Sequence, residues 1–548
     1  MLGRWSIGLV SLGLLCGFAA TAQEAKLSHN LATQITSIHP NPNPELITPD
    51  SLRRVVDKAL QTFHTPGVAV GISHQGQIVH AQGYGHRDLA NELPVNPFTY
   101  FRLASTSKAF TAASVAILVD EGKLAWDDHV IDHLPDFRLH DPYVTREFRI
   151  IDLLTHRSGL DDGAGDAMIW PEPSGFTRGE VIHNLRYLTP RFSFRQTYSY
   201  SNVLYITAAE IVAKVAQMPW AQFIDERIFQ PLDMECYAGD MPLNALNNVA
   251  KGYGHNDERG IYPIPRNEIQ GKELMSAAAG GLVCHVDGML KWIEALLNDA
   301  KAPNGEMIFS SKALANMWRS HTLLNVSSTA RNLHKTHFRA YGIGWRKENI
   351  YGYEMLSHTG TLSGYQAYVA LIPEFELGVV VLNNGSNYGV RSSIMQSIIK
   401  SVMPEAPPMD WVDYYVERQA KAEARWLEQY GEKPEGRGKV NLAASAYFGE
   451  YQSEWYGTMR VFADEQNTIR LVSERMATLT GTLEPFADHS WVVRWDNQNA
   501  ASDAFVHFVV NPKQEVMHFT LHPFQNKIED DHNWRDMTFI KLVMNDTE

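Results

Sequence analysis

Ser105 and Lys108 are the residues whose types and spacing most clearly allow chemistry. They lie three residues apart, immediately before the strongly helical run Ala109 to Asp120. At the first turn of a helix this spacing puts both side chains on one face, where hydroxyl and amine can meet. A serine hydroxyl is a poor nucleophile until a base removes its proton, and a desolvated lysine can be neutral enough to help. The pair therefore predicts nucleophilic catalysis by Ser105, with Lys108 as its activating partner.

The same spacing occurs a second time, at Ser397 and Lys400, so one pair alone does not identify a site. We interpret this second pair as an ordinary feature of a helix, because further motifs accompany the first pair and distinguish it from the second. The first pair is followed along the chain by Tyr200 and Asn202, which stand between a polar loop and a helical run. The tyrosine can share proton transfer with the lysine, and the asparagine can hold both the lysine and a substrate amide.

A third motif, His358-Thr359-Gly360 followed by Thr361, is predicted at the start of a strand. A glycine at this position lets a substrate approach the strand edge closely. A backbone amide just beyond the glycine can complete an oxyanion hole together with the amide of Ser105. The motif therefore predicts a substrate-binding edge beside the nucleophile.

Taken in this order, the three motifs resemble the class C β-lactamase and penicillin-binding-protein family of serine hydrolases, especially its branch of peptidases and esterases. The resemblance runs from Pro49 to Met403 and includes LLTHRSGL at 153–160 and a double glycine at 280–281. It implies an acyl-enzyme on Ser105, with Lys108 and Tyr200 exchanging protons and either of them serving as the base. The residues implied to bind and orient substrate are Asn202, His358, Thr359, Gly360 and Thr361.

The third motif departs from this family at its first position, where β-lactamases and penicillin targets usually carry lysine and this chain carries His358. A histidine is mostly neutral near pH 7, so we expect weaker anchoring of a substrate carboxylate. The resemblance then implies hydrolysis of amide or ester bonds, in D-amino-acid-type peptides or carboxylic esters. Two alternatives stay open: a β-lactamase or D-Ala-D-Ala carboxypeptidase, and a penicillin-binding-type module without turnover.

The resemblance implies neither a cofactor nor a metal. The pairs His129/His133 and His334/His337 have ligand-like spacing, but no third partner accompanies either pair, so we interpret them as surface histidines. Beyond the first 22 residues the cysteines are Cys236 and Cys284, which could pair in an oxidising compartment or remain separate buried residues.

The elements that must position these motifs belong to the α/β (α+β) class. A helix and a hairpin precede a long, mostly helical middle, after which strand patterns return and a final helix follows. The expected helices span 49–63 and 388–403, and the expected strands span 68–72, 78–82, 341–345, 355–356, 365–372 and 378–382. This order predicts a domain over 46–403 in which one antiparallel sheet, flanked by helices, is assembled from both chain ends, with a helical subdomain packed against it.

The composition changes after this domain. Residues 404–440 contain a charged helical run at 411–430 and a Gly/Pro-rich stretch at 431–439, which together predict a helical linker. Short alternating strands over 441–548 predict a small antiparallel β-barrel of roughly eight strands. This region resembles the lipocalin-like barrel that is often appended to such hydrolases.

The N-terminus predicts export. Residues 1–22 have a basic start at Arg4, an apolar stretch at 7–18 and a small-x-small cleavage pattern at 20–22, so we expect a signal peptide followed by a flexible tether at 23–45. We therefore expect a periplasmic or secreted protein without stable membrane insertion after signal removal. The net charge of −14 and the lack of a basic run argue against nucleic acid, leaving a small-molecule or peptide substrate as the expected partner. The sequence sets no oligomeric state.

Overall fold

The structure is a computed structural model that describes residues 46–265, 274–430, 435–498, 502–524, 534 and 537–542. The predicted signal peptide at 1–22 and the predicted tether at 23–45 lie outside the described residues. Among the helices that the structure describes, none combines the length and apolarity needed to cross a membrane.

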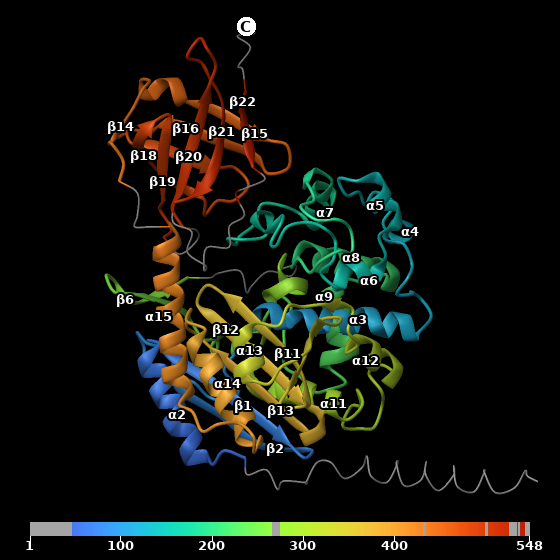
Figure 1. The fold of residues 1–548 in the computed structure, drawn as a ribbon. Coiled ribbons are helices and arrows are strands. Elements are labelled where there is room, and N and C mark those ends of the chain that lie inside the picture. The colour runs from blue at the N-terminus through green and yellow to red at the C-terminus, as the bar shows by residue number, and fades with distance from the viewer. Residues whose placement is uncertain are drawn as a thin grey trace, which may run out of the picture. The chain divides into compact units, whose positions relative to one another are not determined.

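An antiparallel sheet in the order β3-β2-β1-β13-β12-β11-β10-β9-β8 forms the centre of the hydrolase part (Figure 1). Its strands are β1 (Gly67–His74), β2 (Gln77–Asp88), β3 (Leu93–Pro94), β8 (Thr322–Leu323), β9 (Arg339–Tyr341), β10 (Arg346–Ile350), β11 (Tyr353–Leu362), β12 (Tyr365–Ile372) and β13 (Leu377–Asn383). The first strand lies against the last, with Val68 opposite Asn383. The prediction of one sheet assembled from both chain ends is therefore confirmed.

Both faces of this sheet are covered, because successive side chains of a strand point to opposite faces. From β1, Val68 and Val70 join the buried cluster of α2 (Pro49–Thr62) and α14 (Gly389–Ser401). The alternate residue Ala69 joins the cluster on the opposite face, which contains Leu290 of α11 (Val286–Leu297). The continuous apolar run of β1 follows from this two-sided burial.

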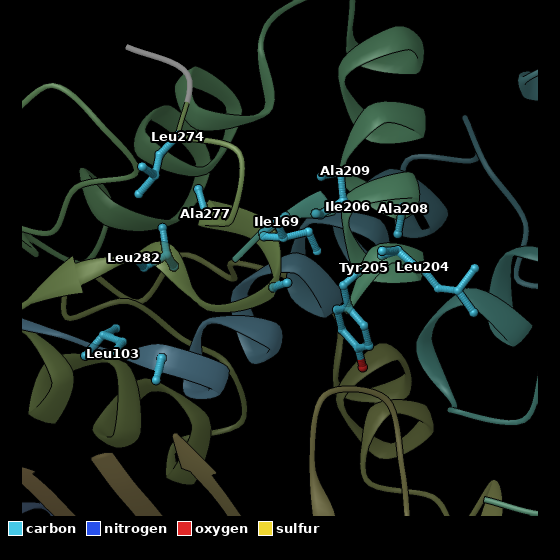
Figure 2. Packing of buried hydrophobic residues seen from close by; sticks show 14 of the residues in the cluster. Leu103, Ile169, Leu204, Tyr205, Ile206, Ala208, Ala209, Leu274, Ala277 and Leu282 are labelled. Carbon is cyan, nitrogen blue, oxygen red and sulfur yellow. The ribbon is translucent and has the colours of Figure 1, made fainter. Parts of the chain in front are cut away.

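The helical subdomain is built around two helices that are buried on nearly every side, α3 (Lys108–Asp120) and α8 (Val203–Ala216). A helix that is apolar around its whole circumference requires such an environment. Figure 2 shows side chains of α8, including Leu204 and Ile206, among residues from distant segments such as Leu103 and Leu282. The other helices of the hydrolase part are α4 (Val130–His133), α5 (Pro142–Glu147), α6 (Ile150–Leu154), α7 (Arg178–Asn184), α9 (Trp220–Ile224), α10 (Leu243–Leu246), α12 (Ser311–Met317) and α13 (Ser328–Leu333), and its short strands are β4 (Phe101–Arg102), β5 (Gly252–Asn256), β6 (Gly260–Ile264) and β7 (Val283–Cys284).

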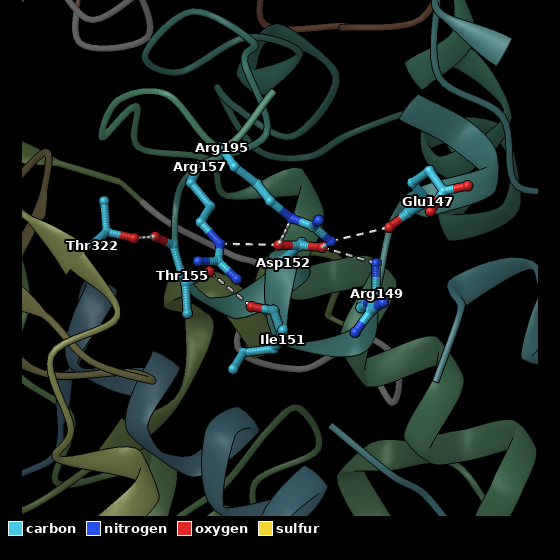
Figure 3. Close-up of polar contacts among 8 residues, drawn as sticks. All are labelled: Glu147, Arg149, Ile151, Asp152, Thr155, Arg157, Arg195 and Thr322. Atoms are coloured by element: carbon cyan, nitrogen blue, oxygen red, sulfur yellow. Dashed lines mark hydrogen bonds and ion pairs between the residues drawn. The ribbon is translucent and has the colours of Figure 1, made fainter. Parts of the chain in front are cut away.

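The segment LLTHRSGL is held by a buried carboxylate. Asp152 accepts from Arg195 Nη2 at 2.6 Å, from Arg157 Nε at 2.9 Å and from the backbone N–H of Arg149 at 3.0 Å (Figure 3). Its side chain has no exposed surface, so two cationic partners and a backbone amide are needed to offset its desolvation. The network fixes the turn that carries His156 toward the centre of the domain.

The strand prediction was wrong at 341–345, where the chain leaves β9 and turns into β10. Gly344 has a φ of +77°, and a Cβ there would lie 3.0 Å from Ala109 Cα and from Lys108 O. The apolar residues Tyr341, Ile343 and Trp345 are buried because this turn presses on α3, so they belong to a packed turn and mimic strand alternation. The motif His358-Thr359-Gly360 also lies well inside β11 and not at its start.

The C-terminal part contains the predicted antiparallel barrel. The strands β15 (Gly449–Ser453), β16 (Gly457–Ala463), β17 (Ile469–Ser473), β18 (Thr480–Asp488), β19 (Ser490–Trp495), β20 (Ala504–Val510), β21 (Val516–Pro523) and β22 (Thr538–Lys541) close on themselves through the pairing of β18 with β19, and β14 (Lys439–Val440) adds to β18. Tyr451, Phe508 and Phe519 pack against one another inside it at tilted or edge-on angles, with ring centroids 4.9 to 5.8 Å apart. The preceding helix α15 (Trp411–Tyr430) packs its first turns into the cluster of α2 and α14.

Polar contacts join the barrel to the hydrolase part. Arg475, between β17 and β18, forms an ion pair with Glu180 at 2.8 Å, and its carbonyl accepts from Gly175 N at 2.8 Å. The carbonyl of Trp455 accepts from Asn184 Nδ2 at 2.7 Å. The barrel therefore contacts α7 and the loop that leads into it.

Candidate active site

Ser105 lies in a 3₁₀ turn, Ala104–Ser107, that runs directly into α3. Ala104 has a positive φ of 47°, a conformation that costs a non-glycine residue about 1 kcal/mol or more. The Ser107 hydroxyl stabilises the turn, since it donates to the Ala104 carbonyl at 2.7 Å and accepts from Leu282 N at 3.2 Å. The strained turn holds the hydroxyl of Ser105 at the N-terminal end of α3.

Lys108 has the close contact with the serine that the spacing predicts. Its Nζ lies 3.3 Å from Ser105 Oγ, 2.6 Å from Asn202 Oδ1 and 2.6 Å from the carbonyl oxygen of Ala279. The side chain is completely buried. Burial lowers the pKa of Lys108 well below its usual value, and Arg346 adds to this effect, whereas the carboxylate of Asp166 opposes it. The amine is thus strongly biased toward its neutral form.

The three contacts of Lys108 determine where its lone pair points. A charged ammonium donates three hydrogens, whereas a neutral amine donates two and keeps one lone pair. The Asn202 Oδ1 and the Ala279 carbonyl can only accept, so they take both hydrogens of the neutral amine. The remaining direction is the one toward Ser105 Oγ, so the neutral amine can accept the serine proton there.

Tyr200 lies over the same amine, with its ring centroid 4.6 Å from Lys108 Nζ. Its ring also packs on His156, with centroids 4.2 Å apart. Burial raises the pKa of Tyr200 well above its usual value, and proximity to the Ser105 hydroxyl opposes this only in part. Tyr200 therefore keeps its proton near neutral pH.

The third motif touches the nucleophile through its glycine. A Cβ on Gly360 would lie 2.4 Å from the Leu103 carbonyl oxygen, 2.8 Å from Ala104 Cβ and 3.1 Å from Ser105 N. These atoms belong to the turn that carries the nucleophile, so only a glycine lets β11 approach it this closely. The structure thus brings together Ser105, Lys108, Tyr200, Asn202 and the third motif.

Replacing Gly360 by alanine is expected to displace this turn and to lower kcat/KM by about 10²-fold, because small misplacements of reacting groups cost that much. The variant should remain folded, since overpacking costs about 1–3 kcal/mol. Steady-state kinetics, with circular dichroism as the check on folding, measures the effect. Full activity of G360A would show that the contact between β11 and the turn is unimportant.

The sequence profile of the Beta-lactamase family matches residues 52–396, which is more than half of the chain. The chain belongs to the Beta-lactamase family. A second profile, described as a domain of unknown function (DUF3471), matches residues 434–540 and so covers the barrel.

Named relatives of this Beta-lactamase family member include hydrolases. The chain is 28% identical over 444 residues to an unguisins hydrolase of Aspergillus violaceofuscus, covering 75% of this chain and 76% of the relative. It is 25% identical over 339 residues to protein flp of Staphylococcus aureus, covering 60% and 62%. The fold is similar to that of an octameric penicillin-binding protein homologue from Pyrococcus abyssi, with a TM-score of 0.57, 22% identity and coverage of 87% and 98%.

His358 is a buried residue whose ring makes two contacts within the protein. Its Nδ1 lies 2.8 Å from the Thr359 carbonyl oxygen and its Nε2 lies 3.1 Å from the Tyr341 hydroxyl. Because a carbonyl only accepts, Nδ1 carries the hydrogen and Nε2 accepts from the tyrosine. Burial, together with repulsion from Arg346, lowers the pKa of His358 well below its usual value. The imidazole is therefore neutral, as the sequence predicts.

Sequence reasoning missed Arg346. This residue lies on β10 opposite Ser357, and its Nη1 donates to Thr359 Oγ1 at 3.3 Å. Among the described residues, no carboxylate forms an ion pair with it. Burial opposes its charge, but the neighbouring tyrosines Tyr198 and Tyr200 keep the pKa of Arg346 above its usual value. A fixed positive charge therefore stands beside the third motif of this Beta-lactamase family site, where lysine is absent.

The ligand-like histidine pairs occur in ordinary surroundings. His133 Nε2 lies 3.1 Å from Asp128 Oδ2, and His129 Nδ1 lies 3.7 Å from Asp132 Oδ2. His334 is half-buried, because it stacks on Trp411 of α15, and burial lowers its pKa to about 3. Over the described part of the chain, no group of three His, Cys, Asp or Glu side chains is arranged to hold a metal ion.

The two cysteines whose pairing the sequence left open are bonded to each other. Cys236 and Cys284 form a disulfide, and Cys284 pairs through β7 with Phe101 of β4. The bond therefore ties Cys236 to β7, whose partner strand β4 leads directly into the turn of Ser105.

Proposed function

We propose that this chain is a serine hydrolase that cleaves amide or ester bonds through an acyl-enzyme on Ser105. The observation that carries the proposal is the completely buried Lys108, whose two fixed acceptors leave its lone pair for the serine proton. Lys108 is the base in this proposal, because the pKa of Lys108 is lowered whereas the pKa of Tyr200 is raised. The opposite shifts make the amine the better proton acceptor and the phenol the better donor.

The proposed reaction has two halves. Ser105 Oγ attacks the substrate carbonyl while Lys108 takes its proton, and the backbone amides of Ser105 and Thr361 stabilise the oxyanion. The Tyr200 hydroxyl donates a proton to the leaving amine or alcohol and regains one from Lys108. Water then attacks the acyl-enzyme with the same groups acting in reverse, which returns Ser105 to its starting state.

Arg346 favours substrates that carry a carboxylate near the bond that is cleaved. Arg346 is half-buried and has no carboxylate partner among the described residues, so a substrate carboxylate would supply that partner. Thr359, which accepts from Arg346, would donate its hydroxyl hydrogen to the same group. Within the proposed class this favours a peptide, of D-amino-acid type, over a neutral carboxylic ester. The same observation supports the second candidate, a β-lactamase or D-Ala-D-Ala carboxypeptidase, because its substrates also carry a carboxylate.

Replacing Arg346 by glutamine is expected to raise KM for carboxylate-bearing substrates by about 10- to 100-fold, since a hydrogen bond to a charged group contributes about 1.5–3 kcal/mol. Hydrolysis of a neutral short-chain nitrophenyl ester should change by only a few-fold. The measurement compares that ester, a D-alanyl dipeptide with a free or amidated C-terminus, and a chromogenic cephalosporin.

Arg339→Gln is the matched control, because Arg339 lies on the neighbouring strand β9 and pairs with Glu348 at 2.9 Å. If R346Q still prefers the dipeptide with the free C-terminus over the amidated one, the assignment of Arg346 is contradicted. Fast turnover of the cephalosporin would favour the second candidate. Covalent labelling of Ser105 by a fluorophosphonate without turnover of any substrate would favour the penicillin-binding-type module.

We also propose that the chain acts outside the cytoplasm, in the periplasm or the medium. The support is the signal-like segment at 1–22 and the presence of a disulfide, which persists in oxidising compartments. N-terminal sequencing of the protein from a fractionated culture should find Gln23 as the first residue. A cytoplasmic chain that retains Met1 would contradict this proposal.

A further inference from the structure

A buried row of three side chains extends from the nucleophile into the helical subdomain. Lys108 Nζ donates to Asn202 Oδ1 at 2.6 Å, and Asn202 Nδ2 donates to Asp166 Oδ2 at 2.7 Å. The exposed fractions are 0% for Lys108, 7% for Asn202 and 9% for Asp166. The motif-based assignment of catalytic groups includes the first two residues and has no role for the third.

We propose that Asp166 is a positioning residue whose carboxylate fixes the side-chain amide of Asn202 in the orientation that presents its oxygen to Lys108. This inference rests on the proposed function, in which Lys108 is the base. It assigns Asp166 no contact with the substrate.

The argument follows from the donors and acceptors of the two neighbours. A side-chain amide has an oxygen that accepts and a nitrogen that donates, and the two are nearly equal in shape. A carboxylate only accepts, so it forms a hydrogen bond with Asn202 only when Nδ2 faces it. That choice leaves Oδ1 for Lys108, where it accepts one of the two hydrogens of the neutral amine.

The opposite orientation would disable the base. If the amide of Asn202 rotated by half a turn, its Nδ2 would face Lys108 Nζ and would need an acceptor there. The lone pair of the neutral lysine is the available acceptor, so it would turn toward Asn202 and away from Ser105. The carboxylate of Asp166 prevents this arrangement, because an amide oxygen turned toward it would meet a second acceptor.

The chain around Asp166 is built to deliver this carboxylate. Gly163 and Gly165 have φ values of +69° and +85°, which side-chain-bearing residues rarely adopt. Gly163 N donates to the Tyr200 carbonyl at 2.9 Å, so the loop lies along the segment that carries Asn202. A Cβ on Gly165 would lie 3.2 Å from Val203 Cγ1, at the start of α8. The two glycines thus let the loop fold tightly against the Tyr200–Asn202 segment.

Asp166 also acts on the amine through its charge. The charged and titratable side chains that face Lys108 or its immediate partners are Asp166, Arg346, His156, His358, Tyr200 and Tyr205. Burial keeps both histidines neutral and the tyrosines protonated, so the charges that remain are those of Asp166 and Arg346. Of these two, Asp166 raises the pKa of Lys108 and Arg346 lowers it. Removing the carboxylate should therefore lower the pKa of Lys108 further.

Two variants of Asp166 separate orientation from charge. D166N keeps an acceptor oxygen and loses the charge, so the acid limb of its kcat/KM profile should move to lower pH by about one unit or more. D166L loses the acceptor as well, and its kcat should fall about 10²-fold with KM little changed. The control is D161N, because Asp161 lies in the same loop but pairs with Arg191 at 3.0 Å, and its profile should match the unaltered protein.

A second measurement needs no substrate. In the full-length protein labelled with ¹³Cε-lysine, the Lys108 signal is assigned by its absence in K108M and is titrated in the unaltered protein, D166N and D161N. We expect a lower Lys108 pKa in D166N alone. If no substrate is turned over through Ser105, the proposed function fails, whereas this titration still tests whether the carboxylate of Asp166 acts on Lys108. An unmoved Lys108 pKa in D166N, or a D166L protein with full kcat, would overturn the inference.

Discussion

Replacing Ser105 by alanine is expected to lower hydrolysis of amide and ester substrates by about 10⁴-fold or more, as for other enzymes that act through a catalytic serine. The variant loses the atom that forms the acyl-enzyme, while the buried surroundings of Lys108 remain. Alanine fits the site without new contacts, so the fold and the affinity for substrate should be retained. Steady-state kinetics and intact-protein mass spectrometry of the acylated protein measure the loss.

Ser397→Ala is the matched control for this experiment. Ser397 has the same spacing to a lysine, but its hydroxyl donates to the Ser393 carbonyl at 2.8 Å within α14. It therefore serves the helix, and S397A should keep full activity. Normal turnover by S105A, or a loss in S397A that is not explained by unfolding, would contradict the assignment of the nucleophile.

Replacing Lys108 by methionine is expected to lower kcat/KM by about 10³- to 10⁴-fold, because a nucleophile and its base act as a unit. Methionine fills a similar volume and removes the amine. In the unaltered protein kcat/KM should rise with pH through the pKa of Lys108, since the neutral amine is the active form. That rise should be missing from the residual activity of K108M, which a kcat/KM profile across pH will test.

Lys400→Met controls for the loss of a buried amine as such. Burial lowers the pKa of Lys400 to about 7, and its Nζ lies 4.3 Å from the ring centroid of Tyr351. A lowered pKa therefore occurs at both lysines, yet only Lys108 faces a serine hydroxyl. Equal activity losses in K108M and K400M would show that the kinetic effect comes from general damage to the domain.

The catalytic pair could be predicted because its geometry is local. Ser105 and Lys108 meet through one turn of chain, and the helix that follows is strongly apolar, so spacing alone brings them together. The same holds for the hairpin of β1 and β2, where Gln75 and Gly76 both adopt the positive φ that a two-residue turn requires. The barrel also followed from a local signal, the alternation of its strands.

The contacts that refine the site could not be predicted, because they depend on neighbours that are distant in the chain. Arg346 belongs to the site because it contacts Thr359 on the adjacent strand, and the residues next to it in the sequence do not indicate a site. The carbonyl of Ala279 is a backbone atom, which the sequence letters do not identify. Asp166 stands in a loop rich in glycine and aspartate, a composition that is also typical of a solvated surface loop. The one usable signal was positional: Arg346 is a cation on the strand that precedes the third motif in the chain.

The pairing of β1 with β13 affects how the protein is made. Val68 leaves the ribosome long before its partner Asn383, so β1 and β2 exist for a time without a neighbour on one edge. Contacts between such distant residues form slowly. An apolar strand with an open edge can meanwhile pair with other chains. Chains that stop before β13 should therefore aggregate, and the yield of native protein should depend on chaperones that shield β1 until β13 is available.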